Sequence, residues 1–191
     1  RWKASTTISN AIGQGEITVT PMHLANLASI VANRGFYYRP HIIKSIDGQA
    51  VDTAFTKPVH TGIDKKHFDV VAEGMANVFR AGTARAFCGK TGTVENFRKI
   101  GGRRVKLPDH SMFVAFAPKD NPKIAIAVVV ENGVWGARWA APIASLMMEH
   151  YIMGGPVDEL RAALEKRMIE GSLEDTYKLY DSMDNPKKTT R

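Results

Sequence analysis

Apolar residues recur at helical spacing after Thr20. Thr20 can cap the free amides at the start of a helix, Pro21 suits its first turn, and Gly35 supplies a left-handed stop. The positions that share one face are Leu24, Leu27, Ala28 and Val31. The pattern predicts a helix that begins at Pro21 and ends before Gly35. The preceding segment, Ile12-Gly13-Gln14-Gly15-Glu16, has two glycines and predicts a tight turn.

A second helical pattern starts near Asp64 and ends at Gly82. Its apolar face consists of Phe68, Val71, Met75 and Val78. A third helix is expected from Trp139 to Met153, with Pro142 in its first turn. This segment is apolar nearly all round, which predicts that it packs against a sheet.

The chain changes character after Gly154-Gly155. Residues 156–170 predict an amphipathic surface helix, and from Ser172 onward the chain is polar, which predicts a loose tail. The apolar side of the surface helix consists of Leu160, Leu164 and Met168. We therefore divide the chain into a main part, 1–153, and a C-terminal surface helix and polar tail, 154–191.

Three segments have the composition of strands, namely 86–95, 110–117 and 123–131. The last two are almost continuously apolar, as expected for strands covered on both faces, and the proline-containing turn between them predicts an antiparallel hairpin. The segment 36–46 is rich in aromatic and β-branched residues, and a short strand within it is expected to pair across the turn at Asp47-Gly48. The predicted fold class is α+β, with an antiparallel sheet of at least three strands and helices packed on it.

Charge adds one feature to this picture. The formal net charge is +7, and five cations crowd the glycine-containing stretch 98–106, where a solvated loop is the favoured interpretation. The alternative is a basic module that binds nucleic acid or a membrane surface. That alternative is disfavoured because Phe97 is the only aromatic residue beside the charges.

The segment Lys90-Thr91-Gly92-Thr93 carries the most chemical information. On a strand, Thr91 and Thr93 point the same way and can present two hydroxyls to one anionic group, while the ammonium of Lys90 supplies a positive charge. Gly92 leaves room for a substrate backbone, so this edge can pair with an extended peptide. The plainer alternative is a polar edge strand whose lysine discourages aggregation.

Cys88 and His110 are two further candidate site residues. The lone cysteine, Cys88, rules out an intramolecular disulfide and is interpreted as a small buried filler rather than a reactive thiol. His110 follows Asp109 and is interpreted as a strand-start histidine with a local hydrogen bond. The histidines show no metal-ligand spacing, so neither a metal nor a cofactor is expected.

The Lys-Thr-Gly motif resembles the third motif of the penicillin-recognising serine enzymes. Further resemblance is carried by SNAIGQGEITVTPMHLAN (9–26), YYRPHIIKSI (37–46), CGKTGT (88–93) and AAPIASLMMEHYI (140–152). The IGQGE and YYRPH segments are similar to those of the penicillin-binding protein 2 group, the elongation-specific class B transpeptidases. The resemblance covers about residues 1–153 and implies the C-terminal part of a penicillin-binding/β-lactamase-like transpeptidase fold.

The resemblance implies roles for single residues. Lys90 and Thr93 would be catalytic, because Lys90 would organise the nucleophile region and the backbone amide of Thr93 would form half of an oxyanion hole. Lys90, Thr91, Gly92 and Thr93 would bind the substrate carboxylate. The implied reaction is attack by a serine on the D-Ala-D-Ala bond of a peptidoglycan stem peptide, followed by transfer of the acyl group to a neighbouring stem, and β-lactams would acylate the same serine.

One departure from the family pattern is plain. No serine of the chain is followed by a lysine three positions later, and no Ser-x-Asn triad occurs. The chain alone is therefore expected to be inactive, and to need the remainder of its own transpeptidase domain. It is also expected to be marginally stable or to aggregate when isolated.

The resemblance also implies a cellular location for the parent protein and leaves an alternative parent open. The resemblance places the parent protein at the periplasmic face of the bacterial inner membrane, with its anchor outside this chain, beside a SEDS-family glycosyltransferase. A β-lactamase or a penicillin-sensing receptor remains as an alternative parent within the same superfamily.

Overall fold

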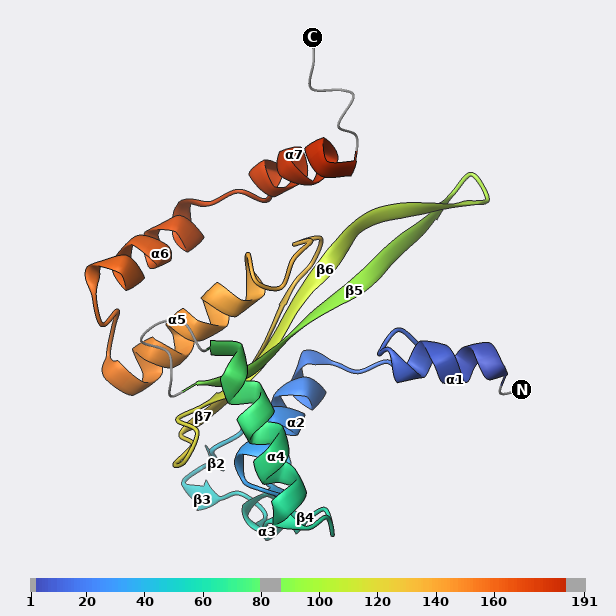
Figure 1. The fold of residues 1–191 in the computed structure, drawn as a ribbon. Helices are drawn as coiled ribbons and strands as arrows, with labels where there is room; N and C mark the ends of the chain where they lie inside the picture. Colours follow the sequence, from blue (N-terminus) through green and yellow to red (C-terminus); the bar gives the residue numbers. More distant parts are fainter. Residues whose placement is uncertain (1–2, 80–86, 185–191) are drawn as a thin grey trace. The chain divides into compact units, whose positions relative to one another are not determined.

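The structure is a computed structural model that describes residues 3–79 and 87–184. The chain forms two compact units (Figure 1). One contains residues 1–19, 91–113 and 128–191, and the other contains residues 20–90 and 114–127. Each unit is described by itself. None of the helices in the described ranges has the length and apolar character needed to cross a membrane.

Helix α2 (Pro21–Ala32) begins as its sequence predicts. The hydroxyl of Thr20 accepts a hydrogen bond from the backbone N–H of His23 at 3.3 Å, and the N–H of Thr20 donates to His23 Nδ1 at 3.2 Å. At the other end the N–H of Gly35 donates to the carbonyl of Ile30 at 2.9 Å. The left-handed turn starts one residue earlier than predicted, because Arg34 already has φ 59° and Gly35 follows with φ 113°.

Helix α4 (Lys65–Ala76) starts after Asp64, as expected, and continues as a short 3-10 turn, η1 (Asn77–Phe79). The predicted apolar face is wrong in part, because Val71 and Val78 are exposed while Phe68 and Ala72 are buried. Residues four apart share a helix face, so Ala72 takes the inward position that Val71 was expected to have. The predicted end at Gly82 lies outside the described residues.

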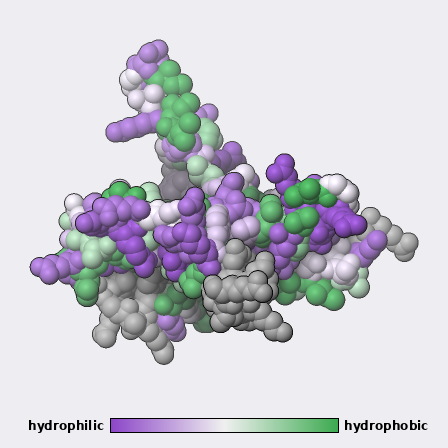
Figure 2. All heavy atoms as spheres, turned by 90° about the horizontal axis from the view of Figure 1, so that it is seen from above, coloured by the Kyte–Doolittle hydropathy of each residue, from purple (hydrophilic) through white to green (hydrophobic). Residues whose placement is uncertain are grey.

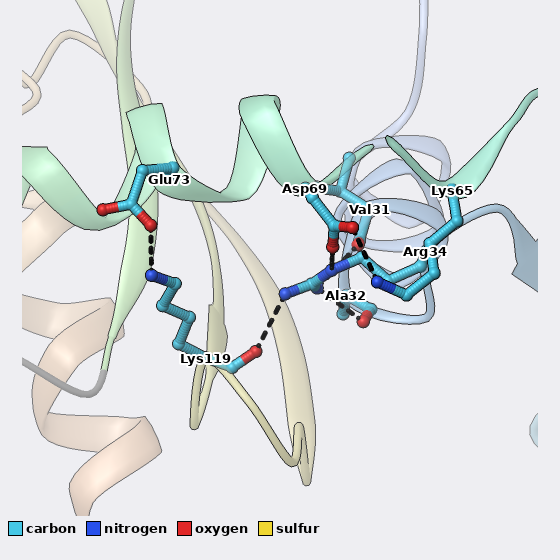
Figure 3. A network of polar contacts seen from close by, with 7 residues as sticks. All are labelled: Val31, Ala32, Arg34, Lys65, Asp69, Glu73 and Lys119. Atoms are coloured by element: carbon cyan, nitrogen blue, oxygen red, sulfur yellow. Dashed lines mark hydrogen bonds and ion pairs between the residues drawn. The ribbon is translucent and has the colours of Figure 1, made fainter. Parts of the chain in front are cut away.

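The core of this second unit combines the two helices with strand residues. Its buried members are Val31, Ala32, Phe68, Ala72, Cys88 and Phe116. A network of polar contacts around Arg34 lies beside them (Figure 3). Hydrogen bonds from Lys65 and then from Arg34 hold the pKa of the Asp69 carboxyl below its usual value, and Lys119 pairs with Glu73.

The short strand expected within 36–46 is confirmed by its pairing across the turn at Asp47-Gly48, but this segment holds two strands rather than one. β1 (Phe36–Tyr37) pairs antiparallel with β4 (Val59–His60), and a separate strand, β2 (Ser45–Ile46), follows later. Pro40 lies between them and has no N–H to donate to a sheet ladder, which explains the interruption.

The turn predicted at Asp47-Gly48 is confirmed. Both residues have positive φ, 48° and 78°, and the turn connects β2 to β3 (Gln49–Ala50) as an antiparallel pair. A single short helix, α3 (Thr53–Thr56), follows this hairpin.

The largest sheet has the order β5-β6-β7. Its strands are β5 (Cys88–Ile100), β6 (Arg103–Ala117) and β7 (Ile124–Val130), which confirms the predicted antiparallel sheet. β5 and β6 are longer than predicted and form a twisted ribbon that ends at Gly101-Gly102 (Figure 1), where both glycines have positive φ. The basic stretch 98–106 is therefore the tip of a hairpin, not a loop. The predicted start at Ala86 lies outside the described residues.

Burial differs between the two apolar strands. In β6, Ala115, Phe116 and Ala117 are consecutive and fully buried, so both faces are covered there, as predicted. In β7 no residue is buried and Val129 is 37% exposed. The prediction that β7 is covered on both faces is therefore wrong for the part of the chain that the structure describes, although Ala125 of β7 packs against the core of the second unit.

The first unit contains the remaining helices, α1 (Ala4–Ala11), α5 (Ala140–Met153), α6 (Glu159–Glu170) and α7 (Leu173–Asp184). The position of α5 agrees with its sequence pattern, and the buried hydroxyl of Ser111 accepts a hydrogen bond from the N–H of Ala140, its first residue, at 3.3 Å. Ser111 also donates to the carbonyl of Trp135 at 3.1 Å. Ser111 thus supplies from β6 the cap that Trp139 lacks.

The C-terminal helices differ from the prediction. Leu160 is 82% exposed, so it does not belong to the inward side of α6. Instead, α6 is fixed to α5 by Arg161, whose Nε donates to the buried Glu149 at 2.8 Å and whose Nη2 donates to Ser145 at 2.9 Å. The loose tail predicted from Ser172 onward is wrong over residues 173–184, which form α7.

Thr176 explains why α7 is ordered. Its side chain is fully buried, and its hydroxyl accepts hydrogen bonds from Trp139 Nε1 at 2.9 Å and from Arg138 Nε at 3.0 Å. A tail of polar composition is thus fixed through one threonine.

Large hydrophobic side chains also lie at the surface. The face shown in Figure 2 has hydrophobic residues interspersed among hydrophilic ones. Ile42, Met147 and Tyr151 are among the exposed examples, at 91%, 53% and 67%. Exposed apolar surface of this kind is typical of a site at which another protein segment packs.

Candidate functional site

The motif Lys90-Thr91-Gly92-Thr93 lies on strand β5, as predicted. Lys90 and Thr93 are exposed, whereas Thr91 and Gly92 are half-buried. Because β5 is the first strand in the order β5-β6-β7, the motif lies on an edge strand of this sheet within the described residues. The motif therefore has the placement that recognition of an extended peptide requires.

A glutamine that the sequence reasoning did not single out contacts this edge. Gln14 Nε2 donates to the carbonyl of Thr93 at 2.8 Å, and the N–H of Glu95 donates to Gln14 Oε1 at 3.4 Å. The N–H and C=O of one strand residue point to the same side of the strand. The backbone N–H of Thr93 therefore faces the same edge as its carbonyl. The sequence signals for Gln14 were the pair of glycines around it and its place in the IGQGE segment that carries the family resemblance.

One face of the motif is covered by the segment before α5. A Cβ placed on Gly136 would lie 2.9 Å from the carbonyl of Met112, 3.2 Å from that of Gly92 and 3.2 Å from Thr91 Cβ. Glycine at 136 is thus required by close approach to the sheet. This approach explains why Thr91 is half-buried while Thr93 is exposed.

Cys88 is fully buried, two residues before Lys90. Burial raises the pKa of its thiol to about 11, although the charges of Lys119 and Arg34 act in the opposite direction. A thiol with this pKa is almost entirely protonated at neutral pH and is a poor nucleophile. The interpretation of Cys88 as a buried filler is confirmed.

The local hydrogen bond predicted for His110 is replaced by a long-range one, since its Nδ1 accepts from the N–H of Asn132, 22 residues away, at 3.0 Å. His110 lies within β6 rather than at the strand start, because β6 begins at Arg103. Asn96 Nδ2 donates to Asn132 Oδ1 at 2.7 Å and completes a local network. Within the described residues no group of three or more His, Cys, Asp or Glu is arranged to hold a metal ion.

The basic hairpin tip uses its only neighbouring aromatic ring internally. The guanidinium of Arg104 lies 3.6 Å from the ring centroid of Phe97. Lys106 pairs with Asp109 at 3.7 Å. One face of the Phe97 ring is thus occupied by Arg104, which weighs against the nucleic-acid alternative.

Residues 1–149 match the family described as the penicillin binding protein transpeptidase domain. The chain is similar to the peptidoglycan D,D-transpeptidase MrdA of Haemophilus influenzae, with 34% identity over 79% of this chain and 26% of the relative. The MrdA of Acinetobacter baumannii is 32% identical over 91% of this chain and 28% of the relative.

Solved structures agree. The fold is similar to that of Pseudomonas aeruginosa PBP2 in complex with WCK 5153, with a TM-score of 0.65, 36% identity, and coverage of 83% of this chain and 34% of that one. It is also similar to penicillin-binding protein A of Mycobacterium tuberculosis in its ceftriaxone acyl-enzyme complex, with a TM-score of 0.61, 28% identity, and coverage of 74% and 34%.

The chain spans about a quarter of the length of the two curated relatives. Its sequence match, its antiparallel sheet and the placement of the Lys-Thr-Gly motif on an edge strand all agree with the same assignment. The chain therefore belongs to the penicillin-binding protein transpeptidase domain family, in the class B group that includes PBP2.

Proposed function

We propose that this chain is the C-terminal part of the transpeptidase domain of a longer peptidoglycan D,D-transpeptidase that cross-links stem peptides and binds penicillin. The observation that carries the proposal is the exposed edge of β5, where Lys90 and Thr93 are accessible in a chain whose residues 1–149 match the transpeptidase family. In this proposal residues 1–153 belong to the transpeptidase domain, and residues 154–191 are a C-terminal addition.

Each motif residue has a proposed role. Lys90 organises the nucleophile region and attracts the substrate carboxylate, and Thr91 and Thr93 donate hydroxyl hydrogen bonds to that carboxylate. The backbone N–H of Thr93 forms half of the oxyanion hole, which its orientation toward the strand edge supports. Gly92 leaves the space in which the substrate backbone approaches the strand.

The remaining machinery is proposed to lie elsewhere in the longer protein. The chain contains neither a Ser-x-x-Lys nor a Ser-x-Asn motif, so the serine nucleophile and its base come from the rest of the transpeptidase domain. We place that protein at the periplasmic face of the inner membrane, beside a SEDS-family glycosyltransferase, with stem peptides ending in D-Ala-D-Ala as substrates.

A fluorescent penicillin tests the proposal. The longer protein is expected to become labelled in one-to-one stoichiometry and to hydrolyse the acyl-enzyme slowly. Lys90→Ala is expected to reduce the rate constant of labelling by roughly a hundredfold or more, as does the loss of one preorganised transition-state contact. Lys123→Ala, at an exposed lysine just before β7, is the matched control.

Three outcomes are distinguished. Absence of covalent labelling contradicts the proposal, and rapid multiple turnover of penicillin indicates the alternative parent, a β-lactamase. Labelling that survives Lys90→Ala at the rate of the unmodified protein removes the role proposed for the motif.

A further inference from the structure

The loop from Ile12 to Glu16 holds a glutamine side chain against the edge of β5. In contact with that edge, the Gln14 amide makes the hydrogen bonds that a neighbouring strand makes, donating to the carbonyl of Thr93 at 2.8 Å and accepting from the N–H of Glu95 at 3.4 Å. One side chain thus replaces two backbone groups of an absent partner strand.

The backbone of the loop is fixed by the end of α1. The N–H of Gly13 donates to the carbonyl of Asn10 at 3.0 Å, and that of Gln14 donates to Ser9 at 2.9 Å. Gly13 has φ 75°, so these contacts form a Schellman ending with glycine at its left-handed position. Gln14 therefore leaves a rigid helix end rather than a flexible loop.

The other side of the loop is equally constrained. A Cβ on Gly15 would lie 1.7 Å from Asn10 Oδ1, so the position accepts only glycine unless Asn10 moves. The hydroxyl of the buried Thr6 donates to Glu16 Oε1 at 3.0 Å and ties the end of the loop back to α1. Every residue from 13 to 16 thus either fixes the loop or contacts β5.

We propose that Gln14 is a positioning residue, which fixes the carbonyl of Thr93 and thereby the backbone that carries the Thr93 N–H, and which ends the accessible edge of β5 at that residue. The inference rests on the function proposed above and deepens it. A peptide that pairs along β5 then meets Thr93 at a fixed orientation. The stretch of β5 with which this peptide can pair ends at Thr93, because the Gln14 amide occupies the edge next to Glu95.

The physical need for such a residue comes from Gly92. Glycine has the largest backbone freedom of any residue, and here it lies directly before Thr93 on an edge strand. The structure shows only ordinary contact around it, since a Cβ on Gly92 would lie 3.5 Å from Met112 Cβ. A fixed external contact at Thr93 and Glu95 restricts the freedom that Gly92 introduces. A preorganised oxyanion hole requires such a restriction.

The test uses two variants of the longer transpeptidase that change Gln14 in different ways. Gln14→Met keeps the length of the side chain and removes both hydrogen bonds. Gln14→Glu keeps an acceptor for the N–H of Glu95 but places a carboxylate oxygen against the carbonyl of Thr93. Gln49→Met, at an exposed glutamine of β3, is the control.

Stopped-flow acylation by a fluorescent penicillin separates the binding constant from the acylation rate constant. Both Gln14 variants are expected to lower the acylation rate constant by roughly three- to tenfold, with a smaller change in the binding constant, as for the loss of a hydrogen bond that orients a reacting group. Hydrogen exchange of the β5 segment is expected to increase at Glu95 in Gln14→Met and to stay slow in Gln14→Glu. A purely structural role would not separate the two variants in this way.

Acylation at the rate of the unmodified protein in either folded variant overturns the inference, as does unchanged exchange at Glu95 in Gln14→Met. Melting temperatures identify a variant that does not fold, and the other variant then decides. Failure of the unmodified protein to react with penicillin contradicts the proposed function instead, and the exchange measurement still tests the contact between Gln14 and β5.

Discussion

Arg34 Nε donates to Asp69 Oδ1 at 2.8 Å and thereby connects the end of α2 to α4 (Figure 3). The same guanidinium donates to the carbonyls of Val31 at 3.1 Å and Ala32 at 2.9 Å, and through Nη2 to that of Lys119 at 3.2 Å. Arg34 thus satisfies the last carbonyls of its own helix and fixes the turn between β6 and β7. These contacts make the arginine the polar centre of the second unit.

Two substitutions of Arg34 distinguish the stability that its hydrogen bonds contribute from the cost of its left-handed backbone conformation. Arg34→Ala is expected to lower the free energy of unfolding by about 2–4 kcal/mol, because several charge-assisted hydrogen bonds to partly buried carbonyls are lost. Arg34→Gly is expected to cost about 1 kcal/mol less, because residue 34 has φ 59° and glycine adopts this left-handed conformation without penalty. Urea denaturation of the longer protein measures both. Equal stability of the two variants would contradict the strain argument.

Cys88 is expected to resist modification in the folded protein. Its thiol has a pKa of about 11 and is fully buried, so iodoacetamide at pH 8 should leave it unmodified until urea unfolds the chain. The pKa in the folded state is raised above the ordinary value of 9.0. Folding therefore favours the protonated thiol, and the stability that depends on this protonated form is fully present below pH 9 and is lost as the pH rises toward 11. Mass spectrometry of the labelled protein gives the first result, and denaturation of Cys88→Ala across this range gives the second.

Thr176→Val tests how α7 is fixed. Valine keeps the shape of threonine but leaves Trp139 Nε1 and Arg138 Nε without their acceptor in a buried place. The expected loss of stability is about 1–3 kcal/mol, with faster hydrogen exchange in α7. The control is Thr53→Val at an exposed threonine of α3, which should change stability by less than about 0.5 kcal/mol. A loss of stability in Thr53→Val as large as in Thr176→Val would contradict the role given to Thr176.

The isolated chain of 191 residues is expected to associate as its concentration rises. β7 pairs with β6, no other strand of residues 3–79 or 87–184 pairs with it, and its seven residues are all apolar. Val129→Lys places a charge at an exposed position of β7 and should reduce association without unfolding the chain. Light scattering after size-exclusion chromatography measures this. A monomer at all concentrations would contradict the role given to β7.

The sequence predicted the elements whose signals are local. Thr20 and Pro21 mark the start of α2, Asp47-Gly48 marks a hairpin, and continuous apolar runs mark β6 and β7. The motif at Lys90 was also placed correctly on a strand. These successes share one physical basis, since capping, turn conformation and side-chain alternation depend on neighbours within a few residues.

The failures concern contacts between distant residues. The polarity of 173–184 gave no sign that Thr176 is buried beside Trp139, and the glycines around Gln14 did not indicate that this side chain reaches β5, 79 residues away in sequence. The charge of the basic stretch 98–106 favours a solvated loop and masks the alternation of a hairpin. Tertiary contacts decide such cases, and a single sequence does not contain them in readable form.

The absence of a side chain at Gly15 restricts how this protein can change. A β-carbon there would lie 1.7 Å from Asn10 Oδ1, so it would displace Asn10 or shift the segment that carries Gln14. Directed evolution of the β5 edge is therefore expected to leave position 15 untouched and to accumulate its substitutions at neighbours that can vary, such as Glu95.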